Sequence, residues 1–145
     1  MNLSNLREHV RARLPDAITD LRALAKDRML ESGVQREAGY TIQNAAGEEA
    51  VVRIYDEIWW LGVNAQDLTR ELDAITAPSI RVEINSPGGD VFDGIAIYNA
   101  LRNHPAHVTT RVDGLAASIA SVIAQAGDKR LIQPAAQLMI HNASS

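Results

Sequence analysis

Residues 40–141 alternate between short segments with a two-residue apolar period and longer segments with a helical period, and this alternation constrains the fold more than any other feature. The expected strands are 40–43, 51–55, 80–84, 108–112, 130–132 and 137–141, and the expected helices are 64–77, 91–103 and 118–126. Strands that alternate with helices at this spacing form βα crossovers. The chain is therefore expected to be an α/β protein with a mainly parallel sheet.

The expected helices have recognisable ends and apolar faces. Asn64 is a good N-cap for the helix that Pro78 ends, and Leu68, Leu72 and Ile75 recur on one side of it. The pair His104-Pro105 stops the helix of 91–103, whose buried side is expected to carry Val91, Ile95, Tyr98 and Leu101.

Residues 4–31 also have a helical period, and Pro15 is expected to divide them into two helices. Charged residues lie between the apolar positions, as on a solvated amphipathic helix. We predict an N-terminal helical arm over residues 1–37, which either lies in solvent or docks on a partner.

Composition excludes several function classes. The 145 residues include no cysteine, which excludes a disulfide framework, Cys-ligated zinc and thiol catalysis. The net charge of -4 and the lack of a basic stripe argue against nucleic-acid binding. No apolar run has the roughly 18 residues of a membrane span, and the first residues do not form an export signal. A cytoplasmic protein that binds neither nucleic acid nor membrane is expected.

Three local features could carry chemistry: the turn 85–90 (Asn-Ser-Pro-Gly-Gly-Asp), the segment 114–121 around Ser118, and the strand end at His141. Each has an ordinary explanation when taken alone. A Pro-Gly-Gly turn can simply reverse the chain, a serine can cap a helix, and a histidine can be hydrogen-bonded in a core.

Together the three features fit acyl transfer, which needs a hydroxyl nucleophile, a base and backbone donors for an oxyanion. Small residues flank Ser118, and the two glycines of the turn leave N–H groups uncovered next to a helix N-terminus. His141 is placed at the carboxyl end of an expected strand, where sites of parallel sheets gather. His9, His104 and His107 occupy less suitable positions.

The three motifs also resemble one known family. The runs Asn85-Ser-Pro-Gly-Gly-Asp-Val-Phe-Asp-Gly-Ile-Ala-Ile-Tyr, Asp113-Gly-Leu-Ala-Ala-Ser-Ile-Ala-Ser and Leu138-Met-Ile-His resemble the proteolytic subunits of Clp protease, the ClpP serine peptidases. The resemblance covers about residues 51–145. Within this family, the ClpP-type head maturation proteases of tailed phages have the most similar motifs. The similarity lies in the sequences Gly-Asp-Val-Phe, Gly-Leu-Ala-Ala-Ser and Met-Ile-His-Asn.

The resemblance implies a role for each matching residue. Ser118 matches the nucleophile, His141 the general base, and Gly89 and Ile119 the backbone N–H donors of the oxyanion hole. It also implies a ClpP/crotonase-like fold over residues 38–145, made of repeated β-β-α or β-α units, and no cofactor or metal. The implied partners are a peptide or protein substrate such as a capsid or scaffold protein, further copies in a homo-oligomeric ring, and an AAA+ unfoldase. The implied location is the cytoplasm of a bacterial host.

One departure from the family pattern bears on activity. The family's triad ends in an aspartate well beyond the histidine, whereas this chain stops four residues after His141. Asp113 and Asp128 precede the histidine and match nothing in the pattern. A chain without the C-terminal handle, the final helices and the acid is expected to have low activity, because loss of that acid costs about 10⁴ in turnover.

Other hypotheses remain open from the sequence. A Ser/Lys protease similar to signal-peptide peptidases would use Lys26 or Lys129, the two lysines of the chain. A crotonase-like acyl-CoA enzyme would share the backbone oxyanion hole, and a non-catalytic structural or regulatory module would use neither Ser118 nor His141. Trp59-Trp60 could serve either an interface or the core. A phosphate-binding loop is excluded because Ser86-Pro-Gly-Gly lacks the Gly-Lys-Ser/Thr ending.

Overall fold

The computed structural model describes residue 24 and residues 38–142. The N-terminal arm expected at 1–37 lies, apart from residue 24, outside the described residues, so the arm and its boundary stay a prediction. The elements are β1 (Tyr40–Gln43), β2 (Glu49–Ile54), α2 (Ala65–Asp73), β3 (Ser79–Ser86), α3 (Val91–Asn103), β4 (His107–Ala117), α4 (Ile119–Ile123), the 3₁₀ helix η1 (Ala124–Ala126), β5 (Lys129–Ile132) and β6 (Gln137–Met139).

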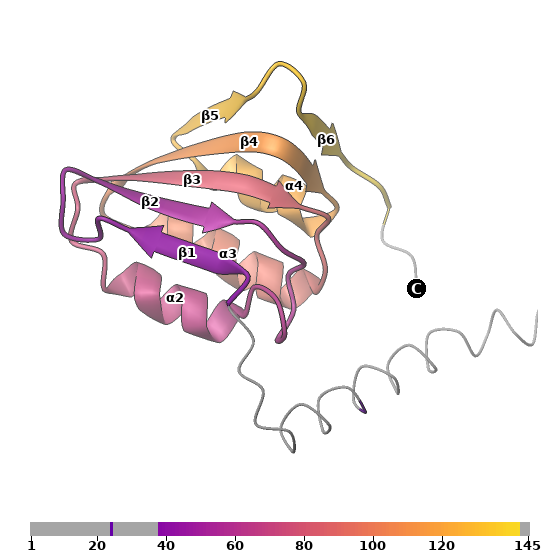
Figure 1. The fold of residues 1–145 in the computed structure, drawn as a ribbon, viewed down its shortest axis with the longest axis horizontal. Helices are drawn as coiled ribbons and strands as arrows, with labels where there is room; N and C mark the ends of the chain where they lie inside the picture. Colours follow the sequence, from indigo (N-terminus) through magenta and orange to yellow (C-terminus); the bar gives the residue numbers. More distant parts are fainter. Residues whose placement is uncertain (1–23, 25–37, 143–145) are drawn as a thin grey trace, which may run out of the picture. The chain divides into compact units, whose positions relative to one another are not determined.

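The strands form one sheet in the order β1-β2-β3-β4-β5, and β6 also pairs with β4 (Figure 1). β1 and β2 form an antiparallel hairpin, whereas all the other pairs are parallel. Parallel neighbours require a crossover connection, which α2 supplies between β2 and β3 and α3 supplies between β3 and β4. The expected α/β class with a mainly parallel sheet is confirmed.

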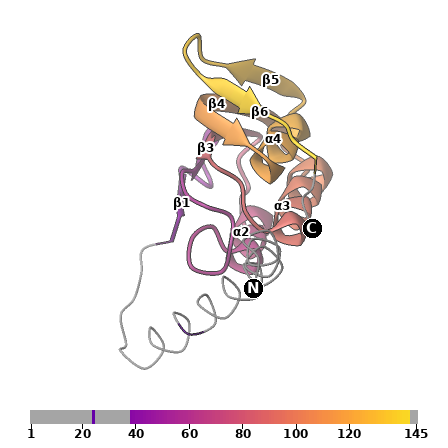
Figure 2. The same cartoon turned by 90° about the vertical axis from the view of Figure 1, so that its right-hand side faces the viewer.

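Helices α2, α3 and α4 cover one face of the sheet (Figures 1 and 2). The core lies between this face and the helices, and its largest fully buried side chains are Val52, Ile54, Ile58, Val63, Leu68, Leu72, Ile80, Val82, Ile84, Ile97, Leu101 and Ile123. Burial of each such side chain is worth about 1.5–3 kcal/mol. Within the described ranges, none of the helices has the length and apolar character needed to cross a bilayer.

Helix α2 begins as the sequence predicts and ends earlier. The Asn64 side chain accepts a hydrogen bond from the Asp67 N–H at 3.1 Å, which confirms Asn64 as the N-cap. Leu68 and Leu72 are buried on the predicted face. The helix ends at Asp73, and the Thr76 and Ala77 N–H groups donate to the Ala45 carbonyl instead of continuing the helix. Ile75 is buried as predicted, but it lies beyond the end of the helix.

The predicted buried face of helix α3 is correct only in part. Leu101 is buried and Tyr98 packs half-buried against the core, as predicted, whereas Val91 and Ile95 are exposed and Gly94 and Ile97 are buried instead. A Cβ on Gly94 would lie 2.1 Å from the Ile119 side chain, so the absence of a side chain lets α3 approach α4 closely on this side. The period of the apolar residues did not predict this contact, because it takes no account of Gly94, where α3 packs against α4.

Strand β4 is longer than predicted, and the helix after it is shorter. β4 runs to Ala117 because Leu115–Ala117 pair with β6, beyond a register shift between Ile84 and Ser86. The predicted helix 118–126 consists of α4 followed by η1. Ser118 consequently stands at the junction of a strand and a helix.

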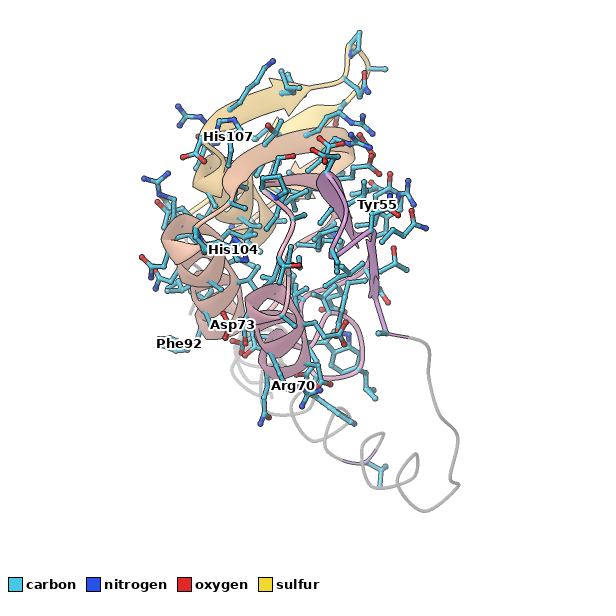
Figure 3. All side chains as sticks on the ribbon, turned by 90° about the vertical axis from the view of Figure 1, so that its left-hand side faces the viewer. Tyr55, Arg70, Asp73, Phe92, His104 and His107 are labelled. Carbon is cyan, nitrogen blue, oxygen red and sulfur yellow. The ribbon has the colours of Figure 1, made fainter. Side chains whose placement is uncertain are left out.

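A network of charged side chains covers the face of the sheet opposite the helices. Glu83 is buried and pairs with Arg53, Arg81 and Arg111, at 2.6, 3.1 and 2.9 Å. Arg111 also binds Asp113, whose carboxylate accepts a hydrogen bond from the Tyr55 hydroxyl and raises the pKa of Tyr55 to about 12. Figure 3 shows Tyr55 on the other side of the sheet from His104 and Asp73.

This network predicts acid-sensitive stability. Burial raises the pKa of Glu83, but hydrogen bonds from Arg53 and Arg81 and the charge of Arg111 outweigh it, so the pKa is lowered overall. A lowered carboxyl pKa stabilises the folded state above the unfolded value of about 4.3, and this contribution is lost as the pH falls further. Glu83→Gln is expected to lower the free energy of unfolding by about 2 kcal/mol at pH 7 and to flatten its decline below pH 4.3.

Urea unfolding of parent and variant across this pH range checks the prediction. Asp67→Asn is the control, because Asp67 pairs with Arg70 on an exposed helix face and such pairs contribute at most about 1 kcal/mol. A Glu83→Gln protein with the parental pH dependence would contradict the assignment.

Candidate active site

Ser118 has an unusual backbone conformation between β4 and α4. Its φ of 54° and ψ of -126° lie in a region that costs a non-glycine residue about 1–3 kcal/mol. Its side chain makes no capping bond to α4. The Ser118 N–H donates to the Met139 carbonyl at 2.9 Å, and the Ser118 carbonyl accepts from Ser121. The surrounding bonds therefore hold the strained residue with its hydroxyl free for another partner.

That partner is His141, which follows β6. The pairing of β6 with Leu115–Ala117 brings His141 to Ser118, and His141 Nε2 lies 2.9 Å from Ser118 Oγ. His141 Nδ1 lies 2.8 Å from the Asn142 carbonyl oxygen, which can only accept a hydrogen bond. This contact places the proton of the neutral ring on Nδ1 and leaves the Nε2 lone pair for the serine proton.

The glycine turn after β3 lies against Ser118. Gly88 and Gly89 have φ values of +93° and +149°, which side chains rarely permit. A Cβ on Gly88 would lie 2.9 Å from Ser118 Cβ and 3.2 Å from the Ile119 nitrogen. The glycine turn and the start of α4 therefore adjoin Ser118.

The structure brings all four predicted residues to one cavity of about 330 Å³. It is lined by Gly89, Val91, Ser118, Ile119, Ser121, Val122, Ile140 and His141. A hydroxyl, an imidazole and two backbone donors around one opening are the groups that acyl transfer needs. The roles of the four residues remain a prediction.

Comparison with known proteins identifies the family. The profile of the family described as Clp protease matches residues 34–145. This chain belongs to the Clp protease family. Among the curated members, the Clp chain is 34% identical over 125 residues to the "ATP-dependent Clp protease proteolytic subunit" of Ligilactobacillus salivarius (strain UCC118), covering 78% of this chain and 59% of that one. This chain is also 44% identical over 68 residues to the protein of the same name from Deinococcus radiodurans. That match covers 46% of this chain and 33% of the relative.

Solved Clp structures share the fold. The ClpP protease catalytic domain from Plasmodium falciparum superposes with a TM-score of 0.58 and 34% identity, over 66% of this chain and 55% of that chain. ClpP1 from Listeria monocytogenes superposes with a TM-score of 0.57 and 30% identity. The match covers 63% of this chain and 55% of ClpP1. The expected ClpP-like fold is confirmed. This chain spans 59% or less of the length of each of these four proteins.

The sequence did not predict the apolar lining of this cavity. Val91, Val122 and Ile140 line the cavity and are 47%, 40% and 77% exposed. Val122 could have been found, because it lies three residues after Ile119 on the same helix and residues at this spacing share a helix face. Phe92, next to Val91, is 81% exposed and projects from α3 in Figure 3.

The other candidate residues of the Clp chain lie elsewhere. His104 is held by the Leu72 carbonyl and the Ala106 N–H, and His107 lies beside Asp128. Lys129 pairs with Thr109, at the end of β4 remote from Ser118, and Lys26 is outside the described residues. The geometry of the described residues therefore offers Ser118 a histidine partner and not a lysine.

Across residue 24 and residues 38–142, no three His, Cys, Asp or Glu side chains form a group that could hold a metal ion. Trp59 and Trp60 are half-buried and contact each other edge to face, with ring centroids 5.9 Å apart. Whether this pair also serves an interface stays a prediction.

Proposed function

We propose that this chain is a serine endopeptidase of the ClpP type, which hydrolyses peptide bonds through an acyl-enzyme on Ser118. The observation that carries the proposal is the 2.9 Å hydrogen bond between Ser118 Oγ and His141 Nε2. A base within hydrogen-bonding distance of a hydroxyl, in a cavity with backbone donors, is the arrangement of an activated nucleophile. Membership of the Clp protease family supports this reading.

The reaction follows from these groups. Ser118 Oγ attacks the scissile carbonyl carbon while its proton passes to His141 Nε2, and the oxygen of the tetrahedral intermediate accepts hydrogen bonds from the Gly89 and Ile119 N–H groups. Collapse breaks the C–N bond, and His141 gives its proton to the leaving amine. Water then loses a proton to His141 and attacks the ester carbon, the C–O bond to Ser118 breaks, and His141 returns the proton to Ser118 Oγ, which releases the acid and restores the free site.

The Asn142 carbonyl can orient His141 but carries no full negative charge. In the family pattern an aspartate stabilises the imidazolium that forms during catalysis, and no residue of this sequence matches it.

The setting belongs to the same proposal. The sequences of the three motifs support a ClpP-type head maturation protease, which acts on capsid or scaffold proteins in the cytoplasm of a phage-infected bacterium. The similar proteins from Ligilactobacillus salivarius and Deinococcus radiodurans are named as proteolytic subunits of an ATP-dependent protease. Those names support assembly of this chain into a homo-oligomeric ring and cooperation with an AAA+ unfoldase.

Labelling with a fluorophosphonate tests the proposal. We expect one phosphonyl group per chain, located on Ser118 by peptide mapping, and the same labelling rate in Lys129→Ala. Absence of label on Ser118 would overturn the serine peptidase assignment. Loss of label in Lys129→Ala would instead favour the Ser/Lys arrangement.

A further inference from the structure

A row of hydrogen-bonded peptide groups ends at the Gly89 N–H. The Gly39 N–H donates to the Gly62 carbonyl at 3.1 Å, the Val63 N–H to the Glu57 carbonyl at 2.8 Å, and the Ile58 N–H to the Gly88 carbonyl at 2.8 Å. Gly62 and Val63 share one peptide group, as do Glu57 and Ile58, and Gly88 and Gly89. The C=O of each of these three peptide groups therefore accepts a hydrogen bond from the preceding group in the row. The N–H of the first two donates to the C=O of the next group.

The geometry of the peptide group gives this row a direction. In a planar trans peptide the N–H and the C=O point in opposite directions, and no described peptide bond is cis. Since the Gly88 carbonyl points at the Ile58 N–H, the Gly89 N–H must point away from Ile58. A Cβ on Gly88 would lie 2.9 Å from Ser118 Cβ, so the glycine turn that carries this N–H adjoins Ser118.

A buried serine holds the peptide group that directly precedes the last one of the row. Ser86 is 1% exposed, and its hydroxyl donates to the Asp56 carbonyl at 2.7 Å and accepts from the Gly88 N–H at 3.1 Å. The Asp90 N–H donates to the Ile58 carbonyl at 2.7 Å. Hydrogen bonds thus fix the glycine turn on both sides of Gly89.

Two glycines permit the row to form. A Cβ on Gly62 would lie 2.2 Å from the Glu57 carbonyl oxygen, and a Cβ on Gly39 would lie 2.8 Å from the Gly62 carbonyl carbon. Ile58 and Val63 are fully buried, which keeps water from competing for their peptide groups. The segment 56–63 is therefore built around these contacts.

We propose that this peptide row, together with Ser86, aims and polarises the Gly89 N–H as an oxyanion donor. Hydrogen bonds in series strengthen one another by about 10–30% per bond, so a donor at the end of a row is stronger than an isolated one. Ser86 acts through Gly88 and is a positioning residue. The inference rests on the proposed function, because an aimed N–H matters only where an oxyanion forms at Ser118.

Ser86→Ala tests the side chain of this arrangement. The Gly88 N–H loses its hydroxyl partner, and we expect the fluorophosphonate labelling rate of Ser118 to fall about tenfold, with the pH dependence of labelling unchanged because the Ser118–His141 pair is intact. For a peptide ester substrate, kcat should fall and KM should stay near the parental value. Ser79→Ala is the matched control, since Ser79 lies on the same strand and donates to the Glu48 carbonyl at 3.0 Å, far from the site.

Gly62→Ala tests the row itself without touching the site. The new Cβ displaces the Glu57–Ile58 peptide, and labelling should again slow about tenfold. Gly127→Ala is the control for strain, because its Cβ would lie 2.5 Å from the Lys129 carbonyl, outside the row. It should lower the melting temperature and leave the labelling rate unchanged.

The outcomes separate the two proposals. A parent chain that takes no label on Ser118 contradicts the proposed function. A labelled parent with folded Ser86→Ala and Gly62→Ala variants that react at the parental rate overturns the peptide row, as does equal slowing in Ser79→Ala and Gly127→Ala.

Discussion

His141→Ala is expected to slow fluorophosphonate labelling of Ser118 by about 10³-fold at neutral pH. The hydroxyl then loses the base that lies 2.9 Å away, and general base catalysis contributes about 10²–10⁴ to such reactions. The rate is measured from the growth of the labelled mass under pseudo-first-order conditions. Melting of the variant should stay close to that of the parent, because the ring is exposed.

His107→Ala is the matched control for this result. Its ring is also exposed, but it lies beside Asp128 rather than Ser118. The control should label at the parental rate. If His141→Ala does so as well, Ser118 does not depend on this histidine and the proposed pair is wrong.

Gly89→Ala is expected to reduce labelling and ester hydrolysis by about 10²–10³, the usual effect of removing one oxyanion donor. The φ of Gly89 is +149°, and a Cβ there would lie 2.1 Å from the Ile58 carbonyl oxygen. The turn must therefore move and redirect its N–H. The Ser118–His141 hydrogen bond comes from other elements and should persist.

Gly47→Ala shows what a glycine replacement does away from the site. Gly47 lies in the β1–β2 hairpin, where a Cβ would be 3.3 Å from Asn44 Cβ, so only a small adjustment is needed. Both variants are compared at a temperature at which circular dichroism shows them folded. A folded Gly89→Ala protein with parental kinetics would exclude Gly89 from the oxyanion site.

The sequence predicted the order of the elements and the four residues that meet at the cavity. Asn64 was recognisable as an N-cap because capping is a local interaction between a side chain and the next turn. Ser118 and His141 were recognisable because parallel strands bring their carboxyl ends to one edge, and because the motifs resemble a family.

The failures of prediction have a common cause in contacts between distant segments. The buried face of α3 depends on how closely Gly94 approaches Ile119, which apolar periodicity does not measure. The end of β4 depends on its pairing with β6, about 20 residues later. Val91 and Val122 line the cavity, although nothing in the motifs shows that these side chains face Ser118.

The sequence by itself therefore determined the α/β class, the family resemblance and the identity of the candidate nucleophile and base, because periodicity and motif are local properties of the chain. The tertiary structure alone decided the 2.9 Å contact of Ser118 with His141 and the strained φ of Ser118. It also decided the peptide row from Gly39 to Gly89. Every residue except proline carries the same peptide N–H and C=O, so their alignment leaves no direct signature in the sequence and appears only when the segments pack together.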